Sequence, residues 1–107
     1  MNEIEAAKAE LAATYQTYED ALMRNDADVL SDLFWDSPET VRYGVTENLY
    51  GNAEISAFRA GRPATGLQRT ITRIEVCALD AVTGFVNLEF RRETPKGTRH
   101  GRQSQFW

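Results

Sequence analysis

The spacing of the apolar residues changes along this chain, and the change limits the folds that it can adopt. Up to Pro63 most apolar residues recur at the intervals of an amphipathic helix, with two short strand-like segments between them. Beyond Leu67 they follow the two-residue period of strands. Helices followed by long antiparallel strands predict an α+β domain, in which the helices pack on one face of a curved antiparallel sheet.

Two helices are expected first. One covers about Glu3 to Arg24 and the other roughly Ala27 to Phe34, with Asn25 or Asp26 as the cap of the second. One apolar stripe of the first helix is formed by Ile4, Leu11, Tyr15, Tyr18 and Leu22. Because a buried tyrosine hydroxyl must find a hydrogen-bond partner, the two tyrosines indicate a polar group nearby.

A third helix is expected to begin at Asn52, which would cap it, with Ile55 and Phe58 buried. Arg59 and Arg62 would leave its C-terminal end. The helix dipole favours cations there, and this alone could explain both arginines.

Two short strands are expected between the second and third helices, at Thr40 to Tyr43 and at Glu47 to Tyr50. The turn tripeptide Asp36-Ser37-Pro38 precedes them. Alternation puts Thr40 and Arg42 on one face of the first strand, so Arg42 is a permanent cation on a structured element. It could equally be solvated or form half of an ion pair.

Three long strands are expected at Leu67 to Leu79, Ala81 to Glu93 and Thr98 to Trp107. The turns between them are placed at Asp80 and at Pro95-Lys96-Gly97. The alternation slips between Ile71 and Ile74, which predicts a bulge or a bend. One face of the second long strand would carry Val82, Val86, Leu88 and Phe90.

Composition limits the partners and the compartment. The net charge of −4 over 107 residues argues against nucleic acid or an anionic membrane, since both need a basic footprint. No apolar run approaches the ~20 residues of a membrane span. Cys77 is the only cysteine, so no internal disulfide can form and a reducing, cytoplasmic location is expected, with Cys77 as a small core residue.

No nucleophile, metal or phosphate motif is present, and neither a metal nor another cofactor is expected. His100 is the single histidine and is expected at the surface, with no nucleophile motif beside it. The arginines are more informative, because guanidinium groups match carboxylates and stay charged on burial. Four of them lie within or beside apolar segments of an otherwise acidic chain: Arg42, Arg59, Arg62 and Arg102.

Several strings in the chain closely resemble the AtzH-like family of the nuclear transport factor 2-like superfamily, which also holds SnoaL-like and ketosteroid-isomerase-like domains. The strings are YEDAL, LFWDSP-x-x-VRYG, ENLYG, FR-x-x-R and GRQSQ-x-W, and they lie between Tyr18 and Trp107. The resemblance implies a single domain over residues 1–107 with a cone-shaped nuclear transport factor 2-like, or cystatin-like, fold.

The family is named for a small amidohydrolase that removes a carboxylate from a dicarboxylated urea. Its catalytic tyrosine and arginine fall on Tyr18 and Arg42 here. Arg42 would hold a carboxylate or stabilise charge on a carbonyl oxygen, and Tyr18 would orient the substrate or protonate the leaving nitrogen. The pocket would lie between the first helix and the concave sheet face. Further substrate-binding residues would be Tyr15, Trp35, Arg59, Arg62 and Arg102.

Family members continue past the GRQSQ segment into a further strand that lies inside the sheet, whereas this chain stops at Trp107. The third long strand would then have an open edge. Because exposed strand edges recruit other chains, a homodimer with the sheet in its interface is expected, with Phe106 and Trp107 contributing.

Two other functions remain open. The domain could be a dimeric module that binds a small anionic molecule without turnover. It could also be a proton shuttle of the ketosteroid isomerase type, which needs a carboxylate in an apolar pocket. Asp36, Glu47 and Glu89 are the candidates, and turn and strand-end positions already explain the first two.

Overall fold

The computed structural model describes residues 2–44, 47–63 and 67–107 of the chain. These residues form three helices and five strands. They divide into two compact units, which we call the sheet unit (Met1–Thr17 and Gln68–Trp107) and the arginine unit (Tyr18–Leu67). The single domain expected from the sequence stays a prediction. None of the described helices has the length and hydropathy needed to cross a membrane.

Helix α1 (Glu3–Met23) contributes its first part to the sheet unit and its last part to the arginine unit. Asn2 caps it by accepting a hydrogen bond from the backbone N–H of Glu5 at 2.8 Å. The predicted stripe is confirmed over its C-terminal half, where Tyr15, Tyr18 and Leu22 are all buried. Ile4 is 41% exposed, so its predicted burial was wrong. The next apolar residue of its stripe is Leu11, two turns further on, so Ile4 has no neighbouring stripe residue to pack against.

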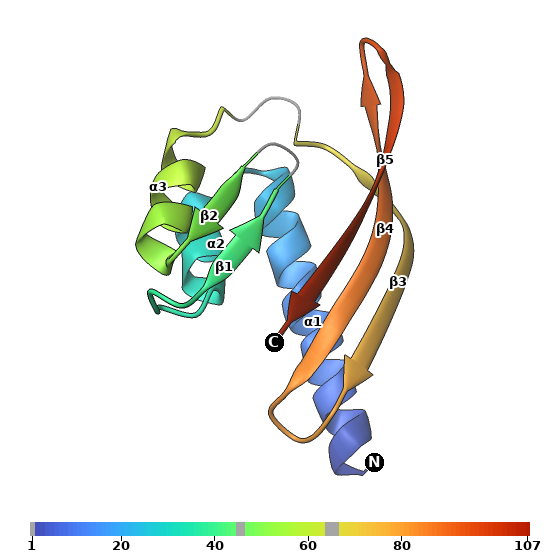
Figure 1. Cartoon of the computed structure of the whole chain (residues 1–107). Coiled ribbons are helices and arrows are strands. Elements are labelled where there is room, and N and C mark those ends of the chain that lie inside the picture. The colour runs from blue at the N-terminus through green and yellow to red at the C-terminus, as the bar shows by residue number, and fades with distance from the viewer. Residues whose placement is uncertain (1, 45–46, 64–66) are drawn as a thin grey trace. The chain divides into compact units, whose positions relative to one another are not determined.

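The sheet unit is built on an antiparallel meander in the order β3-β4-β5, drawn as the long twisted ribbons of Figure 1. Its strands are β3 (Thr70–Ala78), β4 (Gly84–Thr94) and β5 (Gly97–Phe106). The register shifts between Ile71 and Arg73, which confirms the predicted bulge. Among the described residues, β5 pairs with β4 alone.

The two faces of the sheet differ in burial. Val86 and Leu88 are buried as predicted. Val82 is 85% exposed, because it lies in the turn before β4 begins and has no place in the alternation of that strand. Cys77 is exposed, so its predicted core position was also wrong. It pairs with Phe85, which pairs with Phe106 on the next strand, and this row belongs to the outer face.

The arginine unit contains α2 (Ala27–Leu33), a hairpin and a third helix. Asp26 is the cap of α2, since its Oδ1 accepts from the backbone N–H of Val29 at 3.2 Å. The predicted turn after α2 is confirmed. Its Ser37 hydroxyl oxygen accepts from the Glu39 N–H at 3.0 Å, and the Thr40 hydroxyl donates to the Trp35 carbonyl at 2.7 Å.

The hairpin pairs β1 (Val41–Tyr43) with β2 (Asn48–Tyr50), and α3 (Asn52–Gly61) follows directly. The prediction that Asn52 caps α3 was wrong. Gly51 takes the capping position with φ of 86°, a left-handed conformation that favours glycine. The Asn52 side chain instead donates to Oδ1 of Asp36 at 3.3 Å, which ties the start of α3 to the turn after α2.

The turn at Asp80 offers a test of the sheet unit by pH. Its Oδ1 accepts from the Thr83 hydroxyl at 2.7 Å and from the backbone N–H groups of Val82 and Thr83 at 2.9 and 2.8 Å. These bonds, the hydroxyl bond first, lower the pKa of Asp80 below its ordinary value. A lowered pKa means that folding favours the charged carboxylate. Its stabilisation is therefore present above the unfolded pKa of about 3.9 and is lost as the pH falls through the folded pKa.

We expect Asp80→Asn, which keeps an acceptor oxygen but removes the charge, to melt at a lower temperature than the wild type at pH 7. The difference between the two melting temperatures should become smaller as the pH falls below about 3.9. Thermal unfolding of both proteins between pH 7 and pH 2 measures it. A gap that stays constant over this range would mean that the charge of Asp80 does not stabilise the turn.

Candidate functional site

The most unusual side chain of the arginine unit is Arg59, on α3. It is 0% exposed, and it is the largest fully buried side chain among the described residues. Ile55 lies one helical turn earlier and is also fully buried, so the two residues occupy the same inward face. Arg59 lies in the last turn of α3, as predicted, but the helix dipole does not account for its complete burial. Arginine is almost never fully buried without a partner, so its surroundings need an explanation.

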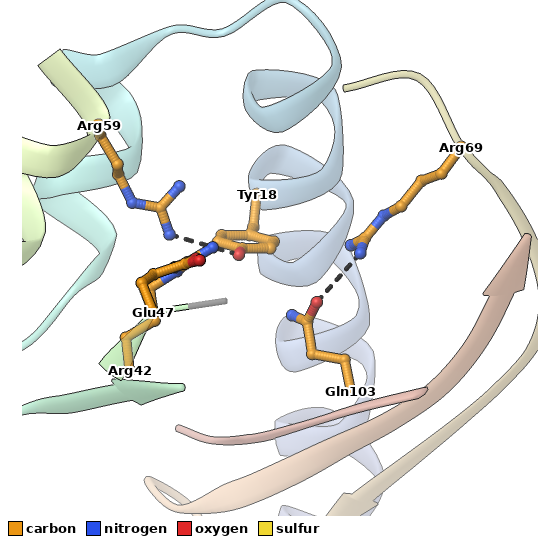
Figure 2. A network of polar contacts seen from close by, with 6 residues as sticks. All are labelled: Tyr18, Arg42, Glu47, Arg59, Arg69 and Gln103. Carbon is orange, nitrogen blue, oxygen red and sulfur yellow. Dashed lines mark hydrogen bonds and ion pairs between the residues drawn. The ribbon is translucent and has the colours of Figure 1, made fainter. Parts of the chain in front are cut away.

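The Arg59 guanidinium points toward the ring and hydroxyl of Tyr18 (Figure 2). Its Nη2 donates to the Tyr18 hydroxyl at 3.5 Å, at the long end for such a bond. Its guanidinium carbon lies 4.8 Å from the centre of the Phe34 ring and 5.8 Å from that of Tyr18. Rings at these distances attract a cation through their negative faces, which offsets part of the cost of burying it.

Two of the three guanidinium nitrogens of Arg59 find no acceptor within the described part of the chain. Its Nε and Nη1 are buried and have no hydrogen-bond acceptor there. Burial lowers the pKa of Arg59, Tyr18 acts in the opposite direction, and the nearby Arg42 lowers the pKa a little further. The guanidinium stays charged at neutral pH even so. The unit therefore holds a buried cation with two unused donors.

Arg42 lies at the centre of β1, on its inward face. Its neighbours Val41 and Tyr43 are 46% and 72% exposed, which confirms the predicted alternation. Arg42 forms an ion pair, since its Nη1 lies 2.9 Å from Oε1 of Glu47 with the two side chains 19% and 22% exposed. The guanidinium also packs over the Phe58 ring at 5.4 Å. Of the two alternatives that the sequence left open for Arg42, the ion pair is the one that forms.

Glu47 reaches Arg42 because of the hairpin turn. The Gly44 N–H donates to the Glu47 carbonyl at 2.8 Å, which places Glu47 diagonally across the hairpin from Arg42. A Cβ at Gly44 would occupy the position of the Glu47 carboxylate. The sequence interpretation treated Glu47 only as a possible base and missed this pairing. Opposite charges on either side of a short glycine turn were the signal for it.

Arg62 follows α3 and completes a group of three arginines. Its guanidinium carbon lies 5.9 Å from the centre of the same Phe58 ring that Arg42 contacts. Its backbone carbonyl accepts from the Asn25 side chain at 3.2 Å, which fixes the end of α3 to the start of α2. The arginine unit thus brings together Tyr18 of α1, Arg42 of β1, and Arg59 and Arg62 of the C-terminal end of α3.

The other proposed substrate-binding residues are not part of this group of four. Trp35 is 65% exposed, and its backbone carbonyl holds the turn after α2. Tyr15 and Arg102 belong to the sheet unit. Tyr15 is buried, whereas the Arg102 side chain is 87% exposed and its Nε lies 3.7 Å from Oε1 of Glu89. Their roles stay predictions.

The sheet unit has a polar contact of its own that the sequence interpretation did not identify. Nη1 of Arg69 donates to Oε1 of Gln103 at 3.0 Å, as drawn in Figure 2, and its guanidinium packs over Phe90 at 4.5 Å. The described residues contain no group of three histidine, cysteine, aspartate or glutamate side chains that could hold a metal ion.

Comparisons with known proteins agree with this architecture. A family model described as AtzH-like matches residues 2–107. A cystatin-like fold protein from Burkholderia xenovorans LB400 is 35% identical with a TM-score of 0.87, and the match covers 95% of this chain and 78% of that one. A protein of unknown function from Pectobacterium atrosepticum SCRI1043 is 32% identical with a TM-score of 0.78, covering 95% and 91%.

A more distant structure extends the fold assignment. A nuclear transport factor 2-like protein of unknown function from Shewanella oneidensis MR-1 is 17% identical with a TM-score of 0.68, and the match covers 92% of this chain and 84% of that one. The fold is therefore the α+β fold of nuclear transport factor 2-like, or cystatin-like, proteins, as expected. No functionally curated protein matches the sequence.

The burial of Arg59 predicts an uncommon stability effect. We expect Arg59→Met to raise the free energy of unfolding by about 1–3 kcal/mol, because the substitution removes a buried charge and its unsatisfied donors while keeping a long side chain. Urea unfolding of the two proteins without added anion measures this. Arg99→Met, at an exposed position, is the matched control and should change little. A destabilised Arg59→Met would mean that Arg59 is structurally satisfied.

Proposed function

The chain belongs to the AtzH-like family, and on that premise we propose that it binds a compact, carboxylated, urea-like anion and releases its carboxylate as carbon dioxide. The ligand is taken up in the arginine unit. Tyr18 and Arg42 act on it directly, Arg59 binds it, and Arg62 is a further cation of the same site. No metal or other cofactor takes part in this proposal.

One observation carries the proposal, and it is the state of Arg59. A fully buried cation with two donor nitrogens that find no acceptor among the described residues is costly to keep. A carboxylate supplies both the missing charge and the missing acceptors, and charge-assisted bonds of this kind are the strong ones. The aromatic rings of Tyr18 and Phe34 around Arg59 suit a small planar molecule such as a urea.

The proposed reaction consists of one bond cleavage and one proton transfer. The bond between the urea nitrogen and the leaving carboxylate carbon breaks, carbon dioxide departs, and the bonding electron pair passes to the nitrogen. That nitrogen takes a proton from the Tyr18 hydroxyl. Arg59 already donates to the same hydroxyl oxygen and stabilises the negative charge left on it, until water returns the proton. Arg42 stabilises charge on the urea carbonyl oxygen.

A non-catalytic binding module is the second candidate, because the state of Arg59 supports binding and does not by itself require turnover. A proton shuttle of the ketosteroid isomerase type has less support. Asp36 accepts from Asn52 in an exposed turn. The Glu89 side chain is 47% exposed on the sheet. Glu47 is the carboxylate beside Arg42, and its ion pair already accounts for its position.

We expect Arg42→Lys to lower the rate of carbon dioxide release from a dicarboxylated urea by about 10²-fold, because lysine keeps the charge but loses the planar fork. Tyr18→Phe should lower the rate by about 10²- to 10⁴-fold, through loss of the proton donor. A carbon dioxide electrode or a coupled assay measures both, with Arg99→Lys as the control. Absence of turnover in the wild type, together with retained anion binding, would establish the binding module instead.

The assembly that we propose is a cytoplasmic homodimer that buries the outer face of β3, β4 and β5. Phe106 is 73% exposed there, in one row with Cys77 and Phe85. Trp107 is half-buried and its Nε1 donates to Gln105 at 2.9 Å, so we propose Phe106 as the larger contributor to the interface. An apolar row of this kind, on a sheet whose β5 pairs with β4 alone among the described residues, favours association.

We expect light scattering at low micromolar concentration to give the mass of a dimer, with a total interface above ~1,000 Å². Phe106→Glu should shift the mass to that of a monomer, because it puts a charge into the proposed interface. Glu39→Gln, at an exposed position of the arginine unit and outside the sheet, is the control. A monomeric wild type would contradict the assembly and leave the anion site unaffected.

A further inference from the structure

The ion pair between Arg42 and Glu47 creates a difficulty for a site that must bind an anion. The Glu47 carboxylate already holds Nη1 of Arg42 at 2.9 Å, and both side chains are largely buried. A carboxylate of the ligand that approached the same edge of Arg42 would compete with Glu47. The two arginines nearest Tyr18 are therefore not equivalent as anion binders.

The difference between them is one of charge compensation. The charge of Arg42 is neutralised by Glu47, whereas Arg59 has aromatic rings and the Tyr18 hydroxyl as its contacts. The guanidiniums are near enough for Arg42 to lower the pKa of Arg59. Figure 2 shows the side chains of Arg42, Glu47, Arg59 and Tyr18 pointing toward one another. Of these two guanidiniums, Arg59 is the one with no carboxylate acceptor for its Nε and Nη1 among the described residues.

We propose that Glu47 determines how many carboxylate groups the preferred ligand carries. One carboxylate of the ligand binds Arg59 without competition, whereas a second carboxylate binds Arg42 only by displacing Glu47. This inference rests on the proposed anion site and adds a residue that sets its specificity. The Glu47 carboxylate then competes with the second carboxylate of the ligand for Arg42. It acts through Arg42 and takes no proton from the ligand.

The hairpin is built so that the Glu47 side chain can leave without disrupting the strands. The Glu47 backbone is held separately, by the bond from the Gly44 N–H to its carbonyl and by the pairing of Tyr43 with Asn48. The carboxylate lies where Gly44 has no side chain. Its displacement breaks the ion pair with Arg42 and does not involve the backbone bonds that set the register of β1 and β2.

The test compares two stable ureas that differ by one carboxylate. Hydantoate carries one carboxymethyl group, and 1,3-bis(carboxymethyl)urea carries two. Isothermal titration calorimetry of the wild type and of Glu47→Gln gives four affinities. We expect Glu47→Gln to bind the dicarboxylate about tenfold more tightly than the wild type does, since the competitor is gone. The affinity for hydantoate should change less than about threefold.

Three further variants make the result specific. Gly44→Ala leaves every charge in place but puts a methyl group where the Glu47 carboxylate lies, so it should shift the ratio of the two affinities in the same direction. Glu39→Gln removes an exposed carboxylate of the same unit and should leave the ratio unchanged. Arg59→Met should abolish binding of both ureas. Circular dichroism checks that each variant is folded.

The outcomes separate the two proposals. Binding that depends on Arg59, together with an unchanged ratio in folded Glu47→Gln and Gly44→Ala, overturns the role of Glu47 and leaves the anion site standing. Equal weakening of both ureas in Glu47→Gln also overturns it, because Glu47 would then serve only to hold Arg42 in place. If neither urea binds the wild type, the proposed function itself fails, and this inference fails with it.

Discussion

The burial of the Arg59 guanidinium beside Tyr18 is the constraint on which the rest of the arginine unit depends. A charge with no exposure to water has to be compensated by what surrounds it. Phe34 and Tyr18 supply ring faces, and the Tyr18 hydroxyl supplies one acceptor. The remaining donors are the basis of the proposed small anionic ligand.

The hairpin of β1 and β2 stabilises a second buried arginine in a different way. Arg42 is also largely buried, but its charge is neutralised by Glu47 across a glycine turn. Arg42 is thus paired with a carboxylate, whereas Arg59 has no carboxylate acceptor for its Nε and Nη1 among the described residues. This difference fits the proposed anion site, because the charge of Arg42 is stabilised until a ligand competes with Glu47.

Sequence patterns predicted the fold well because they report local rules. The change from helical to two-residue spacing gave the element order, and the slip near Ile71 gave the bulge. The wrong predictions concern residues whose burial or capping role depends on their place in a turn or on a strand face more than on their residue type. Val82 falls in a turn and Cys77 on the outer face, although both are apolar, and Gly51 rather than Asn52 begins α3.

The sequence by itself determined the family, the elements and the group of arginines, since these depend on residue type and spacing. Only the tertiary structure decided the state of each arginine. Arg59 and Arg62 look alike in the sequence, three residues apart at a helix end, yet Arg59 is completely buried. The helical turn directs it to the face that Ile55 already buries. Whether a charge is solvated, paired or unsatisfied depends on which segments fold around it, and local spacing carries no information about those segments.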